Sequence, residues 1–154
     1  AIDEALRYDS RVLVEEAAEG RELETAVLGN DEPCVGAIGE IISAGEFYDY
    51  DAKYRSGSSE LRIPADIPAD AAREIGALAT AAYKTLGGAG FSRIDFFYEE
   101  KSGKIYVNEM NTIPGFTAYS MFPLLWQAKG VAYSELIERI IGFGYERHLA
   151  KNNR

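Results

Sequence analysis

Cysteine and histidine are nearly absent from this sequence. Cys34 is the only cysteine and His148 the only histidine. With a single thiol, the chain has no intrachain disulfide and no thiolate cluster for a metal ion. Such cysteine usage is typical of a reducing compartment, so we expect a cytoplasmic protein. Cys34 lies on an expected strand, where we expect it to be a buried small hydrophobe.

Long apolar runs and positive charge are also scarce. No stretch approaches the roughly 18 apolar residues that a membrane-spanning helix needs, and the first residues lack the blocks of a signal peptide. The formal net charge is -9 and the pI is about 4.7. Nucleic acids and anionic membranes bind clustered Lys and Arg, so neither is an expected partner. An anionic ligand would need a metal ion or a few well-placed cations.

What the sequence does contain is the composition of one globular domain, with 47% hydrophobic and 27% charged residues. Apolar runs and polar–apolar alternation predict strands over residues 11–17, 21–28, 35–42, 91–98 and 104–111. Helical spacing predicts helices over residues 2–8, 69–86, 120–127 and 133–146. This order indicates an α+β fold, an antiparallel sheet flanked by helices.

Residues 44–63 interrupt the regular pattern. The stretch is rich in tyrosine and then in glycine and serine. It has too few aliphatic residues for a core element and too many aromatic residues for a disordered linker. We therefore predict an ordered functional loop.

The expected hairpin of residues 91–111 carries the acidic groups of most interest. Alternate residues of a strand point to one face, so Arg93 and Asp95 share a face, as do Glu109 and Asn111. The turn at 99–103 brings Asp95 roughly opposite Glu109, where like charges repel unless a cation lies between them. Two carboxylates and a carboxamide are oxygen ligands suited to Mg²⁺. Taken alone, such a pair is more often the solvated face of an exposed hairpin.

The residues that follow this hairpin favour a site. Residues 108–117 read Asn-Glu-Met-Asn-Thr-Ile-Pro-Gly-Phe-Thr. Oxygen ligands that run into a Pro-Gly turn leave backbone N–H groups near the metal, an arrangement suited to a developing oxyanion. The sequence has no Walker motif, and residues 88–93 fail a dinucleotide fingerprint at its last glycine.

Three groups of motifs resemble the D-alanine:D-alanine ligases of the ATP-grasp superfamily. They are residues 93–97 with 108–117, residues 46–54, which are similar to the omega loop, and residues 12–16 with 20–22, which are similar to the adenine-binding hinge. The resemblance implies an ATP-grasp C-terminal part. Residues 1–44 would belong to the nucleotide-binding subdomain, 45–60 would form an omega-type loop, and 61–154 would form the metal- and substrate-binding subdomain. The family's N-terminal domain would be absent.

The resemblance also implies a reaction, the joining of two D-alanines through an acyl phosphate for peptidoglycan precursor synthesis. ATP and Mg²⁺ would be the cofactors. Asp95, Glu109 and Asn111 would hold two Mg²⁺ ions, or Mn²⁺ in their place, that bridge the ATP phosphates.

Further roles follow from the same resemblance. Arg93 and the backbone N–H of Gly115 would stabilise the tetrahedral intermediate. Ser120 and the N–H of Met121 would bind the carboxylate of the second D-alanine. Ser120 taken alone is a helix N-terminal residue.

Nucleotide and loop residues complete the implied site. The nucleotide pocket would be lined by Glu15, Glu16, Ala18 and Glu22, with Phe47 near adenine. Lys53 would contact the transferred phosphate, and Tyr54 would close the omega loop and exclude water. Individually these residues also fit polar strand positions or an ordinary surface.

Two other readings stay open. A sister ligase would make D-alanyl-D-lactate or D-alanyl-D-serine, although Lys53 and Tyr54 favour the dipeptide product. A non-catalytic acidic metal- or nucleotide-binding module would need neither Arg93 nor the Pro-Gly turn. The partners implied by the resemblance are D-alanine, ATP, the N-terminal part of the same enzyme and a second copy in a homodimer. Without that N-terminal part, we expect the chain to be inactive or very weak.

Overall fold

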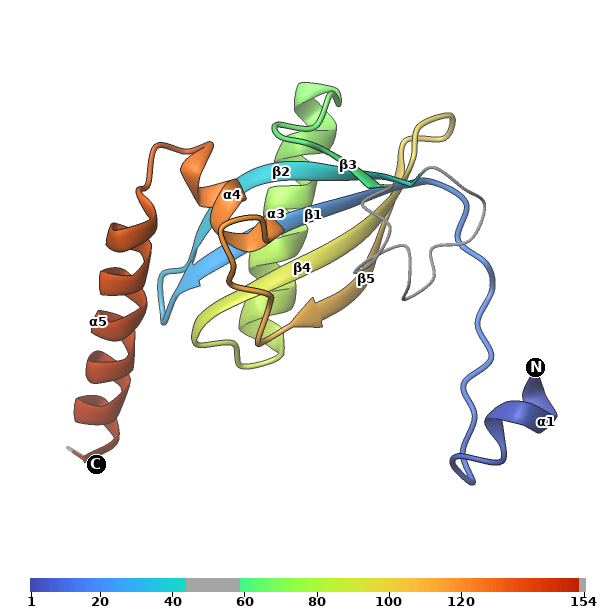
Figure 1. Ribbon diagram of the computed structural model, residues 1–154, viewed down its shortest axis with the longest axis horizontal. Helices are drawn as coiled ribbons and strands as arrows, with labels where there is room; N and C mark the ends of the chain where they lie inside the picture. Colours follow the sequence, from blue (N-terminus) through green and yellow to red (C-terminus); the bar gives the residue numbers. More distant parts are fainter. Residues whose placement is uncertain (44–58, 153–154) are drawn as a thin grey trace.

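A five-stranded antiparallel sheet forms the centre of the computed structural model, which describes residues 1–43 and 59–152 (Figure 1). Its order is β3-β2-β1-β4-β5. The strands are β1 (Arg21–Gly29), β2 (Cys34–Ser43), β3 (Ser59–Arg62), β4 (Gly90–Glu99) and β5 (Lys104–Asn111). The helices are α1 (Ile2–Ala5), α3 (Ala69–Thr85), α4 (Met121–Gln127) and α5 (Tyr133–Asn152). The predicted α+β class is confirmed.

Helix α3 covers one face of the sheet. Its buried residues Ala71, Ile75, Ala79 and Tyr83 recur at four-residue spacing, which places them on one side of a helix. They pack against alternate residues of β1 and β4, such as Leu23 and Phe96. The Tyr83 hydroxyl donates to the Gly29 carbonyl at 2.8 Å, and burial raises the pKa of Tyr83 to about 12.

The opposite face of the sheet changes character along its length. Toward one end, Ala26 and Leu28 of β1 pack in a hydrophobic cluster with Phe122 and Leu125 of α4. Toward the other end, the same face of β1 carries Glu22 and Glu24. The register pairs Glu24 with Asp95 and Ala26 with Arg93, so charged side chains of two strands lie beside the edge of the apolar cluster.

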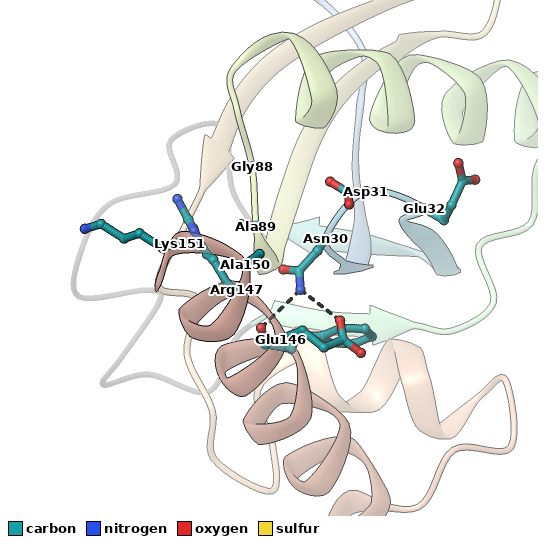
Figure 2. Close-up of a pocket in the computed structure, with 10 residues that line it drawn as sticks. Asn30, Asp31, Glu32, Gly88, Ala89, Glu146, Arg147, Ala150 and Lys151 are labelled. Carbon is teal, nitrogen blue, oxygen red and sulfur yellow. Dashed lines mark hydrogen bonds between the residues drawn. The ribbon is translucent and has the colours of Figure 1, made fainter. Parts of the chain in front are cut away.

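Helix α5 is bound by the turn residue Asn30 to the end of the sheet that lies farther from Glu22 and Glu24. Asn30 donates from Nδ2 to the Phe143 carbonyl and to Glu146 Oε2, both at 3.1 Å (Figure 2). Its Oδ1 accepts from the Gly90 N–H at 3.1 Å. The turn, the start of β4 and α5 are therefore fixed together at the end of β1 opposite to its glutamates.

Four sequence-based expectations differ from the structure. Residues 11–19 form no strand, and Leu13 and Val14 are 79% and 72% exposed, because none of the five strands pairs with them. Cys34 is exposed rather than buried, at the first position of β2. Strand β3 was not predicted, and α5 continues six residues past the predicted end at residue 146, to Asn152.

Residues 44–58, which include Phe47, Lys53 and Tyr54 of the predicted omega-type loop, lie outside the described residues. No helix within the described ranges is long and apolar enough to cross a bilayer.

Candidate functional site

A β-bulge in β5 determines where Glu109 points. From the turn, the pairing runs regularly from Glu99 with Lys104 to Phe96 with Val107, and it then shifts so that Asp95 pairs with Glu109. Asn108 is the extra residue. If the pairing continued regularly through Asn108, Asn108 would lie opposite Asp95 and Glu109 opposite Ile94, on the face that α3 covers. The bulge therefore brings Glu109 and Asn111 to the same face as Asp95 and Arg93.

Arg93 lies among carboxylates from three adjacent strands. Its Nε and Nη2 donate to the two oxygens of Asp95, each at 2.7 Å. Its Nε is also 3.1 Å from Glu24 Oε2, and its Nη2 is 4.0 Å from Glu109 Oε1. The Arg93 side chain is only 9% exposed. The predicted grouping of Arg93, Asp95 and Glu109 on one face is present in the structure.

The charges of this cluster do not balance. Burial disfavours the charged guanidinium, but the hydrogen bond to Asp95 and the charges of Glu24, Asp95 and Glu109 outweigh burial and raise the pKa of Arg93. Arg93 therefore stays protonated. In the part of the chain that the structure describes, the cluster contains three carboxylates and one guanidinium, which leaves two negative charges when all are ionised and so attracts a cation.

The oxygen donors fit a metal ion that shares its shell with other ligands. Among the described residues, no three His, Cys, Asp or Glu side chains converge to hold a metal alone. Both Asp95 oxygens accept from Arg93, and Asn111 Oδ1 accepts from the Ile113 N–H at 3.1 Å. The Glu109 side chain is 59% exposed, so its carboxylate is the accessible metal ligand of the three. Mg²⁺ commonly binds through one or two carboxylates plus phosphates and waters, which this set can accommodate.

The loop after β5 is anchored by aromatic packing. Pro114 is buried, and the Phe116 ring packs between the rings of Phe122 and Tyr133, with centroids 5.6 and 5.5 Å away. The Tyr133 hydroxyl donates to the Phe116 carbonyl at 2.7 Å. These contacts fix the backbone on both sides of Gly115.

Gly115 and Ser120, two residues with separate predicted roles, lie next to each other. A Cβ atom at residue 115 would be 3.0 Å from Ser120 Oγ. Ser120 Oγ accepts from the Thr117 N–H at 2.9 Å, and it makes no capping bond to α4 although Ser120 is the N-cap residue. The Ser120 hydroxyl therefore stabilises the loop before α4 and not the first turn of the helix. Met121, the first residue of α4, is buried beside it.

One cavity borders the carboxylates of the cluster, and a second cavity adjoins the first. The smaller, about 200 Å³, is lined by Glu22, Glu24, Asp95 and Glu109 among others. The larger, about 630 Å³, is lined by residues 15–19 together with Tyr106 and Val107. Phe97 and Asn108 line both. The predicted nucleotide residues Glu15, Glu16 and Ala18 thus border the larger cavity, and Glu22 borders the smaller.

Sequence reasoning missed two residues of this site. Glu24 completes the row of carboxylates across β1, β4 and β5, and Tyr133 supports the loop. Glu24 shares its strand face with Glu22, a signal that the alternation of β1 offers. Its proximity to Asp95 depends on β1 pairing with β4, which the sequence does not indicate.

Comparisons with known proteins identify the family of this chain. A family model described as D-ala D-ala ligase C-terminus matches residues 1–142. The chain belongs to this family. A D-alanine–D-alanine ligase from Geobacillus thermodenitrificans is 52% identical over 151 residues, which are 98% of this chain and 41% of that protein. A ligase of the same name from Acetivibrio thermocellus is 49% identical over 144 residues, 94% of this chain and 38% of that protein.

Solved ligase structures share the fold of this family member. The D-alanine-D-alanine ligase from Coxiella burnetii has a TM-score of 0.85 at 34% identity and covers 99% of this chain. The VanG D-Ala:D-Ser ligase from Enterococcus faecalis has a TM-score of 0.81 at 44% identity over 92% of the chain. A Bacillus anthracis D-alanine–D-alanine ligase complexed with ATP has a TM-score of 0.80 at 29% identity over 97% of the chain. This chain spans 39%, 41% and 48% of their lengths.

Proposed function

We propose that this chain is the metal-binding and product-forming part of an ATP- and Mg²⁺-dependent D-alanine:D-alanine ligase in cytoplasmic peptidoglycan precursor synthesis. The observation that carries the proposal is buried Arg93, placed among Glu24, Asp95 and Glu109 next to two cavities. Residues 1–44 would bind the nucleotide, and residues 45–60 would form the closing loop. Residues 61–154 would bind the metal and the substrates. The N-terminal part of a longer enzyme, and a second copy in a homodimer, are the proposed partners.

ATP would occupy the two neighbouring cavities. The adenine would lie in the larger cavity, which Phe97 and Tyr106 line together with Glu15, Glu16 and Ala18. The ribose would lie near Glu22 and the phosphates near Asp95 and Glu109. The similar Bacillus anthracis ligase that was solved with ATP supports this nucleotide. The family resemblance implies three further roles. Phe47 would lie beside the adenine, Lys53 would contact the transferred phosphate, and Tyr54 would close the loop over the site.

Asp95, Glu109 and Asn111 would hold Mg²⁺, or Mn²⁺, against the phosphates. When bound, the metal neutralises the phosphate charge and so favours transfer. Arg93 keeps Asp95 in a fixed orientation through its two hydrogen bonds. Exposed Glu109 is able to turn its carboxylate toward the phosphates.

The reaction has two steps on this surface. A carboxylate oxygen of the first D-alanine attacks the γ-phosphorus of ATP, which gives an acyl phosphate and ADP. The amine of the second D-alanine then attacks the acyl carbon, loses a proton, and phosphate leaves. The Gly115 N–H and the Arg93 guanidinium would stabilise the oxyanion of this second step. Ser120 and the Met121 N–H would hold the second carboxylate.

The test uses the full-length parent enzyme with Mg-ATP. D-alanine as the only acceptor should release phosphate and form the dipeptide. D-serine and D-lactate, offered with D-alanine, should be poor second substrates, as the names of the 49–52% identical relatives suggest. Phosphate release with another acceptor but none with D-alanine alone would refute the substrate assignment.

Replacing Asn111 tests the metal assignment. Asn111→Ala removes one proposed ligand, so turnover should fall about 100-fold or more, with part of the loss recovered at high Mg²⁺. Asn152→Ala is the matched control, because Asn152 is an exposed residue of α5 whose side chain hydrogen-bonds to His148. Equal turnover of the two variants would exclude a metal-binding role for Asn111.

A further inference from the structure

The loop between β5 and α4 (Figure 1) carries two hydroxyl groups that contact each other. The Thr117 N–H donates to Ser120 Oγ at 2.9 Å, and the Ser120 N–H donates to the Thr117 carbonyl at 3.0 Å. The two hydroxyl oxygens are 2.9 Å apart. The residue before Thr117 is held in place as well, because the Phe116 carbonyl accepts from the Tyr133 hydroxyl. The two hydroxyl groups therefore have a defined relative position.

The hydrogen bonds of Ser120 Oγ determine what this hydroxyl offers to a ligand. A hydroxyl group has one proton to donate and two lone pairs that accept. The Thr117 N–H occupies one lone pair of Ser120 Oγ. Thr117 Oγ1 either donates to the second lone pair or accepts the Ser120 proton. Only the first direction leaves the Ser120 proton available to a ligand.

The backbone of Tyr119 favours that first direction. Its N–H donates to Thr117 Oγ1 in a longer bond of 3.4 Å. Because this donor occupies a lone pair of the Thr117 oxygen, the Thr117 proton is directed toward Ser120. Hydrogen bonds in such a series polarise one another, so the last donor of the series is strengthened. That last donor is the Ser120 hydroxyl.

The space beside Gly115 gives a ligand access to the Ser120 hydroxyl. A Cβ atom at residue 115 would be 3.0 Å from Ser120 Oγ, so a larger residue would crowd the oxygen. Gly115 is exposed and Ser120 is half-buried. A hydroxyl whose two lone pairs are occupied can only donate, so it requires a ligand that accepts. A carboxylate is a group that only accepts.

We propose that Thr117 is a positioning residue for the second substrate. Its N–H and its hydroxyl occupy both lone pairs of Ser120 Oγ, and the Ser120 proton is donated to the substrate carboxylate. This inference rests on the proposed function, which places that carboxylate at Ser120 and gives Thr117 no role. Thr117 acts through Ser120 and not on the reacting atoms.

The test compares two nucleophiles in the full-length parent enzyme with Mg-ATP and D-alanine. D-alanine as the nucleophile has a carboxylate, whereas hydroxylamine has none. Either amine attacks the acyl carbon of the acyl phosphate, loses a proton and displaces phosphate, which gives the dipeptide or the hydroxamate. Thr117→Val removes the hydroxyl and keeps the N–H and the branched shape. It should raise the KM of D-alanine as the nucleophile about 10-fold, as expected for one hydrogen bond, and leave hydroxamate formation at saturating hydroxylamine unchanged.

Three further variants show whether Thr117 acts through Ser120. Thr117→Ser restores the hydroxyl and should restore the KM. Thr117→Val added to Ser120→Ala should have no further effect, because the donor that it orients is already absent. Thr80→Val is the matched control, since it removes a threonine hydroxyl that donates to the Gly76 carbonyl within α3. Thermal unfolding verifies that each variant is folded, and Thr117→Ala replaces Thr117→Val if the latter is not.

Three results would overturn the proposal. A wild-type KM in Thr117→Val would show that the hydroxyl does not orient Ser120. An equal loss of dipeptide and hydroxamate formation would show that Thr117 only maintains the loop. A further loss when Thr117→Val is added to Ser120→Ala would show that Thr117 acts independently of Ser120.

Failure of the proposed function gives a different result. The wild-type enzyme would then form a hydroxamate with another acid and none with D-alanine. The Thr117 variants are in that case compared with this acid and with the nucleophile that the wild type joins to it. The difference between that nucleophile and hydroxylamine still decides the role of Thr117.

Discussion

At the scale of single residues, Arg93 decides whether the acidic face of the sheet can fold. Its guanidinium is buried and contacts Asp95 at 2.7 Å and Glu24 at 3.1 Å. Arg93→Met would remove the guanidinium from both ion pairs, and removing one partner of a buried ion pair costs about 3–5 kcal/mol. The free energy of unfolding of Arg93→Lys should lie between those of the wild type and Arg93→Met, because an ammonium cannot make both hydrogen bonds to Asp95 in the same geometry.

Urea unfolding at pH 7 measures this effect. Added Mg²⁺ should recover part of the stability of Arg93→Met, since the ion supplies the missing positive charge. An Arg93→Met variant as stable as the wild type, without metal, would show that the cluster is held by other contacts.

A second residue, Glu40, makes stability depend on acid pH. Arg21 donates to its two oxygens at 2.6 and 2.8 Å, and this hydrogen bonding lowers the pKa of Glu40 below its ordinary value of 4.5. A lowered folded pKa contributes stability that is present above pH 4.5 and is lost as the pH falls through the folded value. Glu40→Gln should therefore lower the free energy of unfolding by about 1–3 kcal/mol at pH 7.

The pH dependence of that difference is the measurement. Unfolding free energies of wild type and Glu40→Gln should converge as the pH is lowered from 7 toward 3, because wild-type Glu40 becomes protonated. A difference that stays constant over this range would mean that Glu40 contributes through its shape and not through its charge.

At the scale of elements, the bulge in β5 accommodates Asn108 between two regular stretches of pairing. Deleting Asn108 would remove the bulge and leave Glu109 opposite Asp95 and Met110 opposite Ile94, so Glu109 should stay on the acidic face. Loss of the local bulge conformation should lower the free energy of unfolding by about 0.5–3 kcal/mol. Asn108→Gly keeps the extra residue and should lower the free energy of unfolding by about 1 kcal/mol or less.

Thermal unfolding of the two variants, with and without Mg²⁺, separates the effects. Mg²⁺ should raise the melting temperature of the wild type and of both variants, because Glu109 stays on the acidic face in each. A folded deletion variant that no longer responds to Mg²⁺ would show that the bulge itself, and not the pairing with Asp95, orients Glu109.

The elements show which parts of this fold are encoded locally. Strands β1, β2, β4 and β5 and helix α3 were predicted to within about two residues, because each carries its own periodicity and ends at a turn signal. The predicted strand at 11–17 was wrong, because an apolar run forms a strand only where another strand offers hydrogen bonds. Strand β3 has four residues, too few to show alternation.

The candidate site divides in the same way. Asp95 opposite Glu109 follows from one hairpin, so local pairing predicted it. The position of Glu24 beside Asp95 follows from β1 pairing with β4, two strands that are 60 residues apart along the chain and meet at Gly29 and Gly90. Such long-range pairing has no local signal.

At the scale of the whole molecule, the sign of the charge limits what this chain does by itself. The cavities proposed for ATP are lined by eight acidic residues: Glu15, Glu16, Glu19, Glu22, Glu24, Asp95, Glu99 and Glu109. Within residues 1–43 and 59–152, Arg93 contacts this row, and it is already bound to Asp95 and Glu24. A triphosphate entering these cavities is repelled unless divalent ions accompany it.

The 154-residue chain should therefore bind ATP only together with Mg²⁺, and at least 10-fold more weakly than the full-length enzyme does. Its ADP release with D-alanine should be below about 1% of the full-length turnover. Calorimetry with ATP, in EDTA and then in excess Mg²⁺, measures the first effect, and a coupled ADP assay measures the second. ATP binding of equal strength in EDTA would place the nucleotide away from the carboxylates, since only a site without them tolerates the uncompensated phosphates.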